Sequence, residues 1–154
     1  MSLYGAYDPD NIFARILRGE LPSVRVWEDE DTLAFMDVFP QSEGHVLVID
    51  KGSTARNILE IEPERLAKLA LAVQRTARAV EKALSPDGIK IVQFNGEAGG
   101  QTVFHLHVHV IPRWEGLAMK GHGHAPMAET GALRALADRI AAALRAGQSP
   151  EEVA

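Results

Sequence analysis

The stretch GGQTVFHLHVHVIPR, residues 99–113, decides how the rest of the sequence is interpreted. It holds three of the six histidines of the chain, His105, His107 and His109, and they alternate with leucine and valine. In a β-strand successive side chains point to opposite faces of the sheet, whereas in a helix this spacing would scatter the histidines around the axis. The alternation, the β-branched valines and Pro112 therefore predict a strand with one apolar face and one histidine face.

Three interpretations of a histidine face are open from the residues alone. Ordinary packing is disfavoured, because imidazoles that protonate near pH 6.5 repel one another. A metal site suits two adjacent histidines, but His105 and His109 would lie about 13 Å apart on a strand, which is too far for one zinc ion to bind all three. A neutral imidazole can instead attack phosphorus, while neighbouring histidines position groups and donate a proton. The preceding loop, NGEAGGQT, favours this third interpretation, because glycines such as Gly100 let backbone N–H groups approach an anion.

The composition limits the class of protein. With 154 residues, of which 46% are hydrophobic and 24% charged, the sequence predicts a single domain over residues 1–154. Its core is expected at about residues 10–113, followed by a C-terminal segment, 114–147, and a frayed tail, 148–154. A net charge of −5 without long basic runs argues against a nucleic-acid partner.

The sequence lacks two features that would point to particular chemistry or to a membrane or secreted location. The chain has no cysteine, which excludes a thiolate metal site and a cysteine nucleophile. It has neither a run of about 20 apolar residues nor the order of charges that marks a secretory signal. We therefore expect a cytoplasmic protein without a membrane partner.

The hydrophobic periodicity predicts an α+β fold. Helices are expected over residues 8–19, with Asp8 as the N-cap, over 62–84 and over 132–147. Strands are expected over residues 23–28, 32–37, 45–50, 89–95 and 103–111. This order indicates a mainly antiparallel sheet of about five strands, with one long helix and flanking shorter helices near each terminus.

The string HLHVHVI, residues 105–111, resembles the histidine triad signature, after which the HIT superfamily of nucleotide hydrolases and transferases is named. Residues 11–51 and 93–113 are also similar to the two halves of that domain, so the likeness covers most of residues 10–113. The length and layout most resemble the Hint-like branch, whose members hydrolyse nucleoside phosphoramidates and related adenylates. Because His109 is present where the transferases typically have glutamine, the resemblance favours hydrolysis.

The resemblance implies roles for four histidines. His107 would be the nucleophile and would form a covalent nucleotidyl-histidine that water then resolves. His109 would contact the phosphate or the leaving group and assist proton transfer. His105 would orient the array, and His45 would approach the phosphate from a neighbouring strand.

The resemblance also implies how the nucleotide is held. Asp37 matches the acidic residue that binds the ribose hydroxyls. The remaining positions surround the α-phosphate, namely Asn95, Gly100, Gln101 and Thr102, or wall the base, namely Phe13, Ile16, Phe35, Val38 and Phe39. The apolar walls specify the base weakly, so an AMP-like purine nucleotide is the expected ligand.

No cofactor and no metal are expected. Asn11 and Ala14 stand where some bacterial relatives carry zinc-binding cysteines. Two other functions stay open: hydrolysis of dinucleoside polyphosphates, and a nucleotide-binding regulatory module with slow turnover.

Family members form homodimers, in which the segment after the triad often reaches the partner's active site. A homodimer is therefore expected here as well. His122 and His124 lie in that segment, and we expect them to be loop histidines of a glycine-rich turn rather than catalytic groups.

Overall fold

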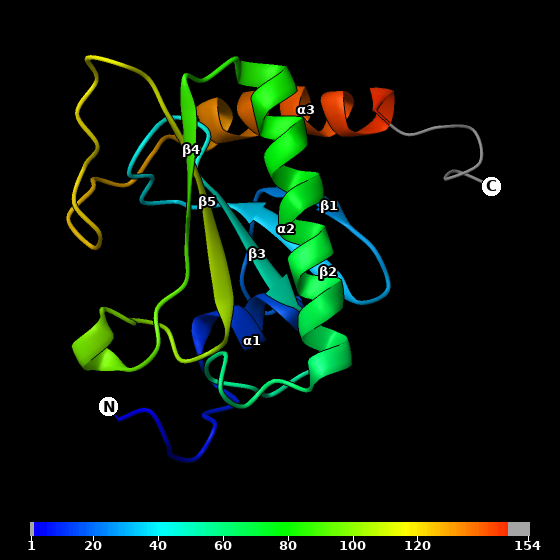
Figure 1. Ribbon diagram of the computed structural model, residues 1–154, viewed down its shortest axis with the longest axis vertical. Coiled ribbons are helices and arrows are strands. Elements are labelled where there is room, and N and C mark those ends of the chain that lie inside the picture. The colour runs from blue at the N-terminus through cyan, green and yellow to red at the C-terminus, as the bar shows by residue number, and fades with distance from the viewer. Residues whose placement is uncertain (1, 148–154) are drawn as a thin grey trace.

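The computed structural model describes residues 2–147 and shows three α-helices and one five-stranded sheet in them (Figure 1). The predicted frayed tail, 148–154, lies outside the described residues. In chain order the elements are α1 (Ile12–Leu17), β1 (Arg25–Glu28), β2 (Thr32–Met36), β3 (Val46–Asp50), α2 (Pro63–Leu84), β4 (Gly88–Val92), a 3₁₀ turn (Glu97–Gly99), β5 (His107–Arg113) and α3 (Thr130–Ala146).

The sheet has the strand order β1-β2-β3-β5-β4, and every neighbouring pair is antiparallel. The predicted α+β fold with a mainly antiparallel sheet of five strands is confirmed. β3 and β5 lie side by side, with Ile49 opposite His107 and Leu47 opposite His109. Because paired residues of two strands share a face, these two histidines and these two apolar residues point to the same side of the sheet.

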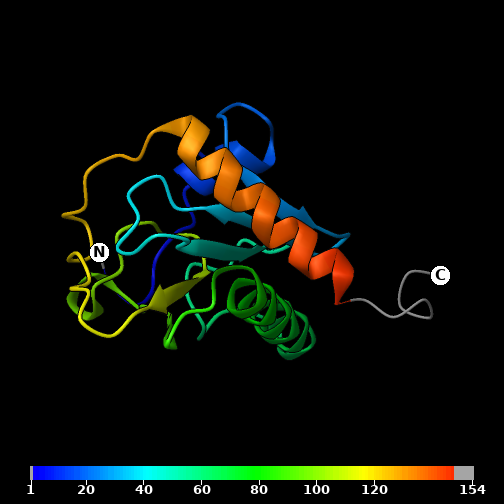
Figure 2. The ribbon, with the colours of Figure 1, turned by 90° about the horizontal axis from the view of Figure 1, so that it is seen from above.

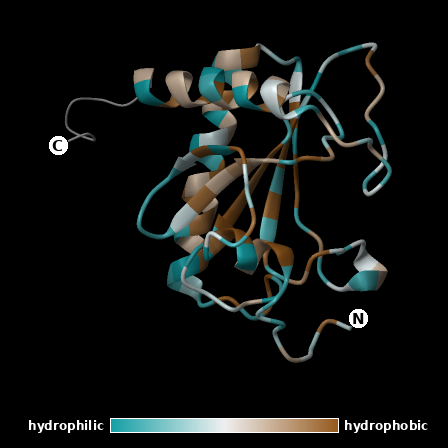
Figure 3. Ribbon diagram, turned by 180° about the vertical axis from the view of Figure 1, so that it is seen from behind, coloured by the Kyte–Doolittle hydropathy of each residue, from teal (hydrophilic) through white to brown (hydrophobic). Residues whose placement is uncertain are grey.

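The two faces of the sheet are covered differently. Figure 2 shows α1 and α2 on opposite sides of the sheet, and α3 packs against α2 and against β1. The strands are the most hydrophobic part of the ribbon (Figure 3). The face towards α2 and α3 carries the larger core, which includes Ala34, Met36, Val46, Val48, Val80, Val110 and Ile140. The face towards α1 carries a smaller cluster of Phe13, Ile16, Leu33, Phe35, Leu47 and Ile49.

The helix boundaries follow from their caps. α2 was predicted over 62–84 and forms over Pro63–Leu84, because proline is favoured in the first turn and Ser85 ends the helix in a left-handed conformation. The expectation that Asp8 caps the first helix was wrong. The Asn11 side chain accepts hydrogen bonds from the N–H groups of Phe13 and Ala14, while Asp8 instead closes the preceding turn by accepting from the N–H of Asp10.

The prediction of one strand through residues 103–111 was partly wrong. β5 begins only at His107, and residues 103–106 bend away before it. The partner strand explains this difference, since β3 ends at Asp50, directly after the pair Ile49 and His107. His105 therefore lies outside the ladder, and it does not share a strand face with His107 and His109.

β4 forms one edge of the sheet and is shorter than the predicted strand 89–95. Its residues are exposed or half-buried, and Ile91 is 48% exposed. Among the described residues, no helix has the length and the apolar character that would let it cross a membrane.

Candidate active site

A cavity of about 440 Å³ opens on the α1 side of the sheet. The chain segments around it are α1, the connection from β2 to β3, the loop before β5 and the segment between β5 and α3. Nine of the predicted site residues line it: Phe13, Ile16, Phe35, Asp37, Val38, Phe39, Thr102, His107 and His109. The folded chain thus brings the predicted base walls, the predicted ribose ligand and two of the triad histidines to one cavity.

His107 is held as a neutral imidazole with a defined proton position. Its Nδ1 lies 2.6 Å from the carbonyl oxygen of His105, and because a carbonyl only accepts, Nδ1 carries the proton. The lone pair is therefore on Nε2. Burial lowers the pKa of His107 to about 4, and the His105 and His122 rings contribute smaller decreases. At neutral pH this side chain presents an unprotonated nitrogen, as a nucleophile requires.

His45 and His109 form a hydrogen-bonded pair whose direction is fixed by one backbone group. The N–H of Gln41 donates to Nδ1 of His45 at 3.1 Å, so the proton of neutral His45 is on Nε2. That Nε2 lies 2.9 Å from Nδ1 of His109 and donates to it. The proton of His109 is consequently on its Nε2. His45 is fully buried behind His109, and it acts on the cavity through His109 rather than by direct contact.

Both members of this pair are kept uncharged. Burial is the main cause that lowers the pKa of His45 to about 3 and that of His109 to about 2. The neighbouring imidazoles lower both pKa values further, because a second positive charge nearby would be repelled. His109 therefore offers an N–H donor, not a cation, to the cavity at neutral pH.

His105 supports the array from outside the cavity. Its Nε2 donates to the carbonyl oxygen of Asp50 at 3.3 Å, and its Nδ1 accepts from the hydroxyl of Tyr7 at 2.8 Å. Its own carbonyl oxygen accepts the proton of His107. The main-chain carbonyl of His105 therefore sets the tautomer of His107, and this contact is how His105 would orient the array.

Asp37 lies at the cavity wall with its carboxylate half-buried. Its Oδ1 accepts from the N–H of Phe39 at 2.8 Å, and its Oδ2 lies 3.5 Å from Nε2 of His45. Burial raises the pKa of Asp37 to about 6, although the bond from Phe39 opposes this shift. At this position the carboxylate can accept hydrogen bonds from hydroxyl groups of a bound molecule. The ribose-binding role of Asp37 stays a prediction.

The loop before β5 presents its side chains differently from the expectation. The Gln101 amide accepts from the N–H of Gly96 and donates to the carbonyl oxygens of Arg56 and Val103, so it braces the loop. The Asn95 Oδ1 accepts from the N–H of Ile58, and neither amide lines the cavity. Only Thr102 of the polar residues predicted around the phosphate lies in the cavity wall, and the phosphate-binding roles stay predictions.

The backbone conformation at position 100 explains why a glycine is found there. Its φ of +101° is a conformation that residues with a side chain rarely adopt, and an added Cβ would lie 3.0 Å from the Phe94 ring. Phe94 in turn contacts His109, with ring centroids 5.5 Å apart. The glycine therefore lets the loop close against the aromatic residue that supports the triad.

The model of the HIT domain family matches residues 18–116 of the sequence. The chain belongs to the HIT family. It is 42% identical over 103 residues to the protein named hit of Bacillus subtilis, across 67% of this chain and 70% of that protein. It is 37% identical over 106 residues to an adenylylsulfatase of Arabidopsis thaliana, across 69% of this chain and 53% of that protein. The solved structure of a HIT-like protein involved in cell-cycle regulation from Bartonella henselae matches with a TM-score of 0.82 and 48% identity, and covers 90% of this chain and 99% of that one.

The HIT family assignment confirms the resemblance found in the sequence, and the fold agrees with it. The matched residues include the signature at 105–111, Asp37 and His45. The roles of these residues stay predictions.

Within residues 2–147, one group of side chains could hold a metal ion. Asp37, His45 and His109 each offer one ligand atom, and these three atoms lie within 4.8 Å of one another. A cation there would displace the proton between His45 and His109, whose nitrogens are already at hydrogen-bond distance. That no metal is needed stays a prediction, which removal of metal ions tests.

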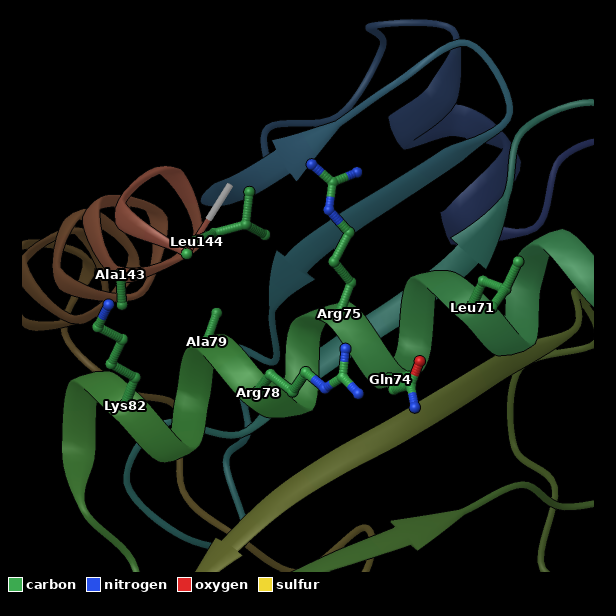
Figure 4. Close-up of a pocket in the computed structure, with 9 residues that line it drawn as sticks. Leu71, Gln74, Arg75, Arg78, Ala79, Lys82, Ala143 and Leu144 are labelled. Carbon is green, nitrogen blue, oxygen red and sulfur yellow. The ribbon is translucent and has the colours of Figure 1, made fainter. Parts of the chain in front are cut away.

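A second cavity of about 410 Å³ lies between α2 and α3. Figure 4 shows the cationic side chains of Arg75, Arg78 and Lys82 along α2, with Ala143 and Leu144 contributed by α3. It contains none of the histidines and none of the other predicted site residues. The predicted site residues therefore do not gather at this cavity.

Sequence reasoning missed the contacts of Tyr7 and Gln41, and it missed that His122 lines the cavity. Tyr7 is 98 residues from the histidine it contacts, so no local pattern could reveal it. His122 lies in a turn, as expected, and its half-buried ring also lines the cavity with His107 and His109. His124 is exposed, in agreement with the expectation. The family match ends at residue 116, before either histidine.

Proposed function

We propose that the protein hydrolyses a phosphoramidate or phosphoanhydride bond at the α-phosphate of a purine nucleotide and releases the nucleoside monophosphate. The observation that carries this proposal is the state of His107. Its Nδ1 proton is bound by the His105 carbonyl oxygen, its pKa is lowered to about 4, and it lines the cavity. A neutral, oriented imidazole is the form that attacks phosphorus.

The proposed reaction has two displacements. In the first, the Nε2 lone pair of His107 forms a bond to the α-phosphorus, and the bond to the leaving group breaks with its electron pair going to that group. An amine leaving group departs with the Nε2 proton of His109, whereas a phosphate or sulfate departs as an anion that only accepts a hydrogen bond from it. In the second, water attacks the phosphorus and the N–P bond breaks. One proton of the water restores Nε2 of His109 when an amine has left, and passes to solvent when an anion has left. Nucleoside monophosphate then leaves with His107 neutral again. Splitting the displacement lowers the barrier of each step.

The walls of the cavity support a nucleoside at the side of His107 that faces α1. The Phe13 ring lies edge-on to the His107 ring, with centroids 4.9 Å apart, and Ile16 adds an apolar surface. The Asp37 carboxylate supplies acceptor oxygens for ribose hydroxyls. That the adenylylsulfatase relative acts on an adenylate agrees with this arrangement.

The test is release of AMP from adenosine 5′-phosphoramidate, in excess chelator, by the native protein and by His107→Ala. We expect turnover by the native protein only, with a nucleotidylated protein detected by mass after rapid quenching. His124→Ala, at an exposed histidine, is the matched control and should keep the activity. Loss of the native activity in chelator would instead indicate a metal-dependent hydrolase, and AMP binding without turnover on any nucleotide would indicate a binding module.

Diadenosine polyphosphates are the alternative substrates. They share the nucleoside and the α-phosphate, and differ in the leaving group. A native protein that cleaves them but leaves the phosphoramidate intact would move the assignment to dinucleoside polyphosphate hydrolysis.

We further propose that two copies pair along β4. This strand is an edge of the sheet, and Ile91 on it is 48% exposed. An exposed edge strand with apolar side chains favours pairing with another strand. A homodimer paired along β4 would satisfy the backbone groups of this edge and cover Ile91.

A further inference from the structure

His122 reaches the active site from a segment that the histidine triad does not include. Figures 1 and 2 show the connection between β5 and α3 as a long excursion at one side of the sheet. Two backbone hydrogen bonds of 2.9 Å tie it down on either side of His122: the N–H of Lys120 donates to the carbonyl oxygen of Gln41, and the N–H of Ala128 donates to that of Val38. The segment thus closes over the site of its own chain.

The ring of His122 is held by two aromatic contacts and one hydrogen bond. Its centroid lies 4.7 Å from that of Phe94 and 5.3 Å from that of His109, to which it is nearly perpendicular. Its Nδ1 lies 3.3 Å from Nε2 of the Gln41 side chain, which donates to it. The proton of the neutral His122 ring is therefore on Nε2.

Two N–H donors are then left without an acceptor. In the part of the chain that the structure describes, Nε2 of His109 and Nε2 of His122 are both buried and have no hydrogen-bond partner. Buried polar groups of native proteins are nearly always paired, so an unpaired donor needs an explanation. Both side chains line the cavity that contains His107, and a ligand oxygen there would satisfy them.

The two ends of the triad strand differ in chemistry. Phe13 of α1 contacts the rings of His105 and His107, whereas His122 contacts the ring of His109. His107 therefore lies between an apolar end and an end with N–H donors. A nucleoside at the apolar end places the leaving group at the end of His109 and His122.

We propose that His122 is a leaving-group residue, whose Nε2–H binds an anionic oxygen of the group that departs from the α-phosphorus. The proposal rests on the proposed function and specifies its substrate class: mixed anhydrides of a nucleoside monophosphate with a phosphate, a sulfate or a carboxylate. When His107 forms the N–P bond, the P–O bond breaks and its electron pair stays on the leaving oxygen. That negative charge strengthens the hydrogen bond from His122, because donors bind ionised acceptors more strongly than neutral ones.

The first experiment compares two substrates that share the nucleotide. Adenosine 5′-phosphosulfate has an anionic leaving group, and adenosine 5′-phosphoramidate has an amine. For His122→Ala we expect kcat/KM to fall about 10- to 100-fold on the phosphosulfate and less than about 3-fold on the phosphoramidate, as suits the loss of one hydrogen bond to a charged group. His122→Gln keeps an N–H donor and should recover part of the loss, while His124→Ala should behave as the native protein.

An equal loss on both substrates would overturn the proposal, because it would show that His122 only supports the fold. No loss on either substrate would overturn it as well. The thermal midpoint of each variant, measured in parallel, identifies a variant that fails to fold.

A binding experiment separates this proposal from the proposed function. The Kd values of AMP and of α,β-methylene-ADP, which cannot be cleaved at the methylene bridge, are measured for the native protein and for His122→Ala. We expect the variant to bind AMP within about 3-fold of the native protein and to bind α,β-methylene-ADP at least about 10-fold more weakly. If the native protein cleaves neither substrate, the proposed function fails, yet this selective loss would still support His122 as the ligand of a leaving-group phosphate. An unchanged ratio of the two Kd values would overturn the proposal.

Discussion

Nδ1 of His107 lies 2.6 Å from the carbonyl oxygen of His105, two residues earlier in the chain. This contact is possible because residues 103–106 bend out of the strand and turn that carbonyl towards the His107 ring. A regular strand would direct the same carbonyl to a neighbouring strand. The break at the start of β5 is thus what fixes the proton of the proposed nucleophile.

The pH dependence of kcat/KM should contain two acid limbs. Protonation of Asp37, whose pKa is raised to about 6, weakens its acceptance of ribose hydroxyls, and protonation of His107, at about 4, removes the attacking lone pair. We expect kcat/KM on the phosphoramidate to decline below about pH 6 and more steeply below about pH 4. Asp37→Asn should lower the plateau and remove the upper limb only. An upper limb that persists in Asp37→Asn would contradict this assignment.

Acid should destabilise the fold through the buried histidines. The folded-state pKa of His107 is about 4, below its unfolded value of about 6.5, so the unfolded chain binds more protons in that window. The stability is complete above about pH 6.5 and is lost as the pH falls towards 4. For this one group the loss between pH 8 and pH 5 is about 2 kcal/mol.

Urea unfolding of the native protein and of His107→Asn at pH 8 and pH 5 measures this effect. The variant should lose less stability between the two pH values than the native protein does. His124→Asn, at an exposed site, is the control and should reproduce the native difference. Equal losses in all three proteins would show that His107 does not titrate in this way.

Tyr7 should act as a positioning residue for the triad. Tyr7→Phe removes the hydroxyl that donates to Nδ1 of His105 at 2.8 Å and leaves the ring in place. We expect a loss of about 1 kcal/mol of stability and a several-fold lower kcat, because the main chain of His105 holds the proton of His107. The Kd of AMP should stay unchanged, which a general loss of structure would not allow. Tyr4→Phe, at an exposed tyrosine, is the matched control.

Ile91→Glu tests the pairing of two copies along β4. A charge on an exposed edge strand opposes pairing with another strand, and a glutamate facing its own copy adds repulsion. Sedimentation should show a dimer for the native protein and a monomer for the variant at the same concentration. Leu3→Glu, at another exposed apolar residue, should leave the mass unchanged. A native protein that sediments as a monomer would exclude this homodimer.

The sequence predicted the elements whose signal is local. α2 has an apolar stripe at helical spacing, a proline at its start and a left-handed residue at its end, and its boundaries were predicted within one residue. His107 and His109 point to one face, as their alternation indicated, because β5 pairs on both sides with β3 and β4. The hydrophobic periodicity of an element and the residues that cap a helix depend on neighbours in the sequence, so both can be recognised before the fold is known.

The features that the sequence did not reveal depend on contacts between residues that are distant in sequence. The start of β5 is set by the end of β3, which the residues before His107 do not encode. The amide of Gln101 braces the main chain at Arg56, 45 residues away, a contact that no local pattern reveals, and its phosphate-binding role stays a prediction. His122 lies in a glycine-rich turn, and its place at the site depends on backbone bonds to the β2–β3 connection and on contacts with Gln41, Phe94 and His109.

The closure of the segment 114–128 over its own chain has a genetic consequence. In the proposed homodimer, a cell that carries one copy altered at His107 and another altered at His122 would form mixed dimers in which every cavity lacks one of the two histidines. Such alleles should fail to complement each other, whereas a segment exchanged between subunits would restore one intact cavity in each mixed dimer. An inactive allele should likewise leave an intact partner subunit working, so it should behave as recessive rather than dominant.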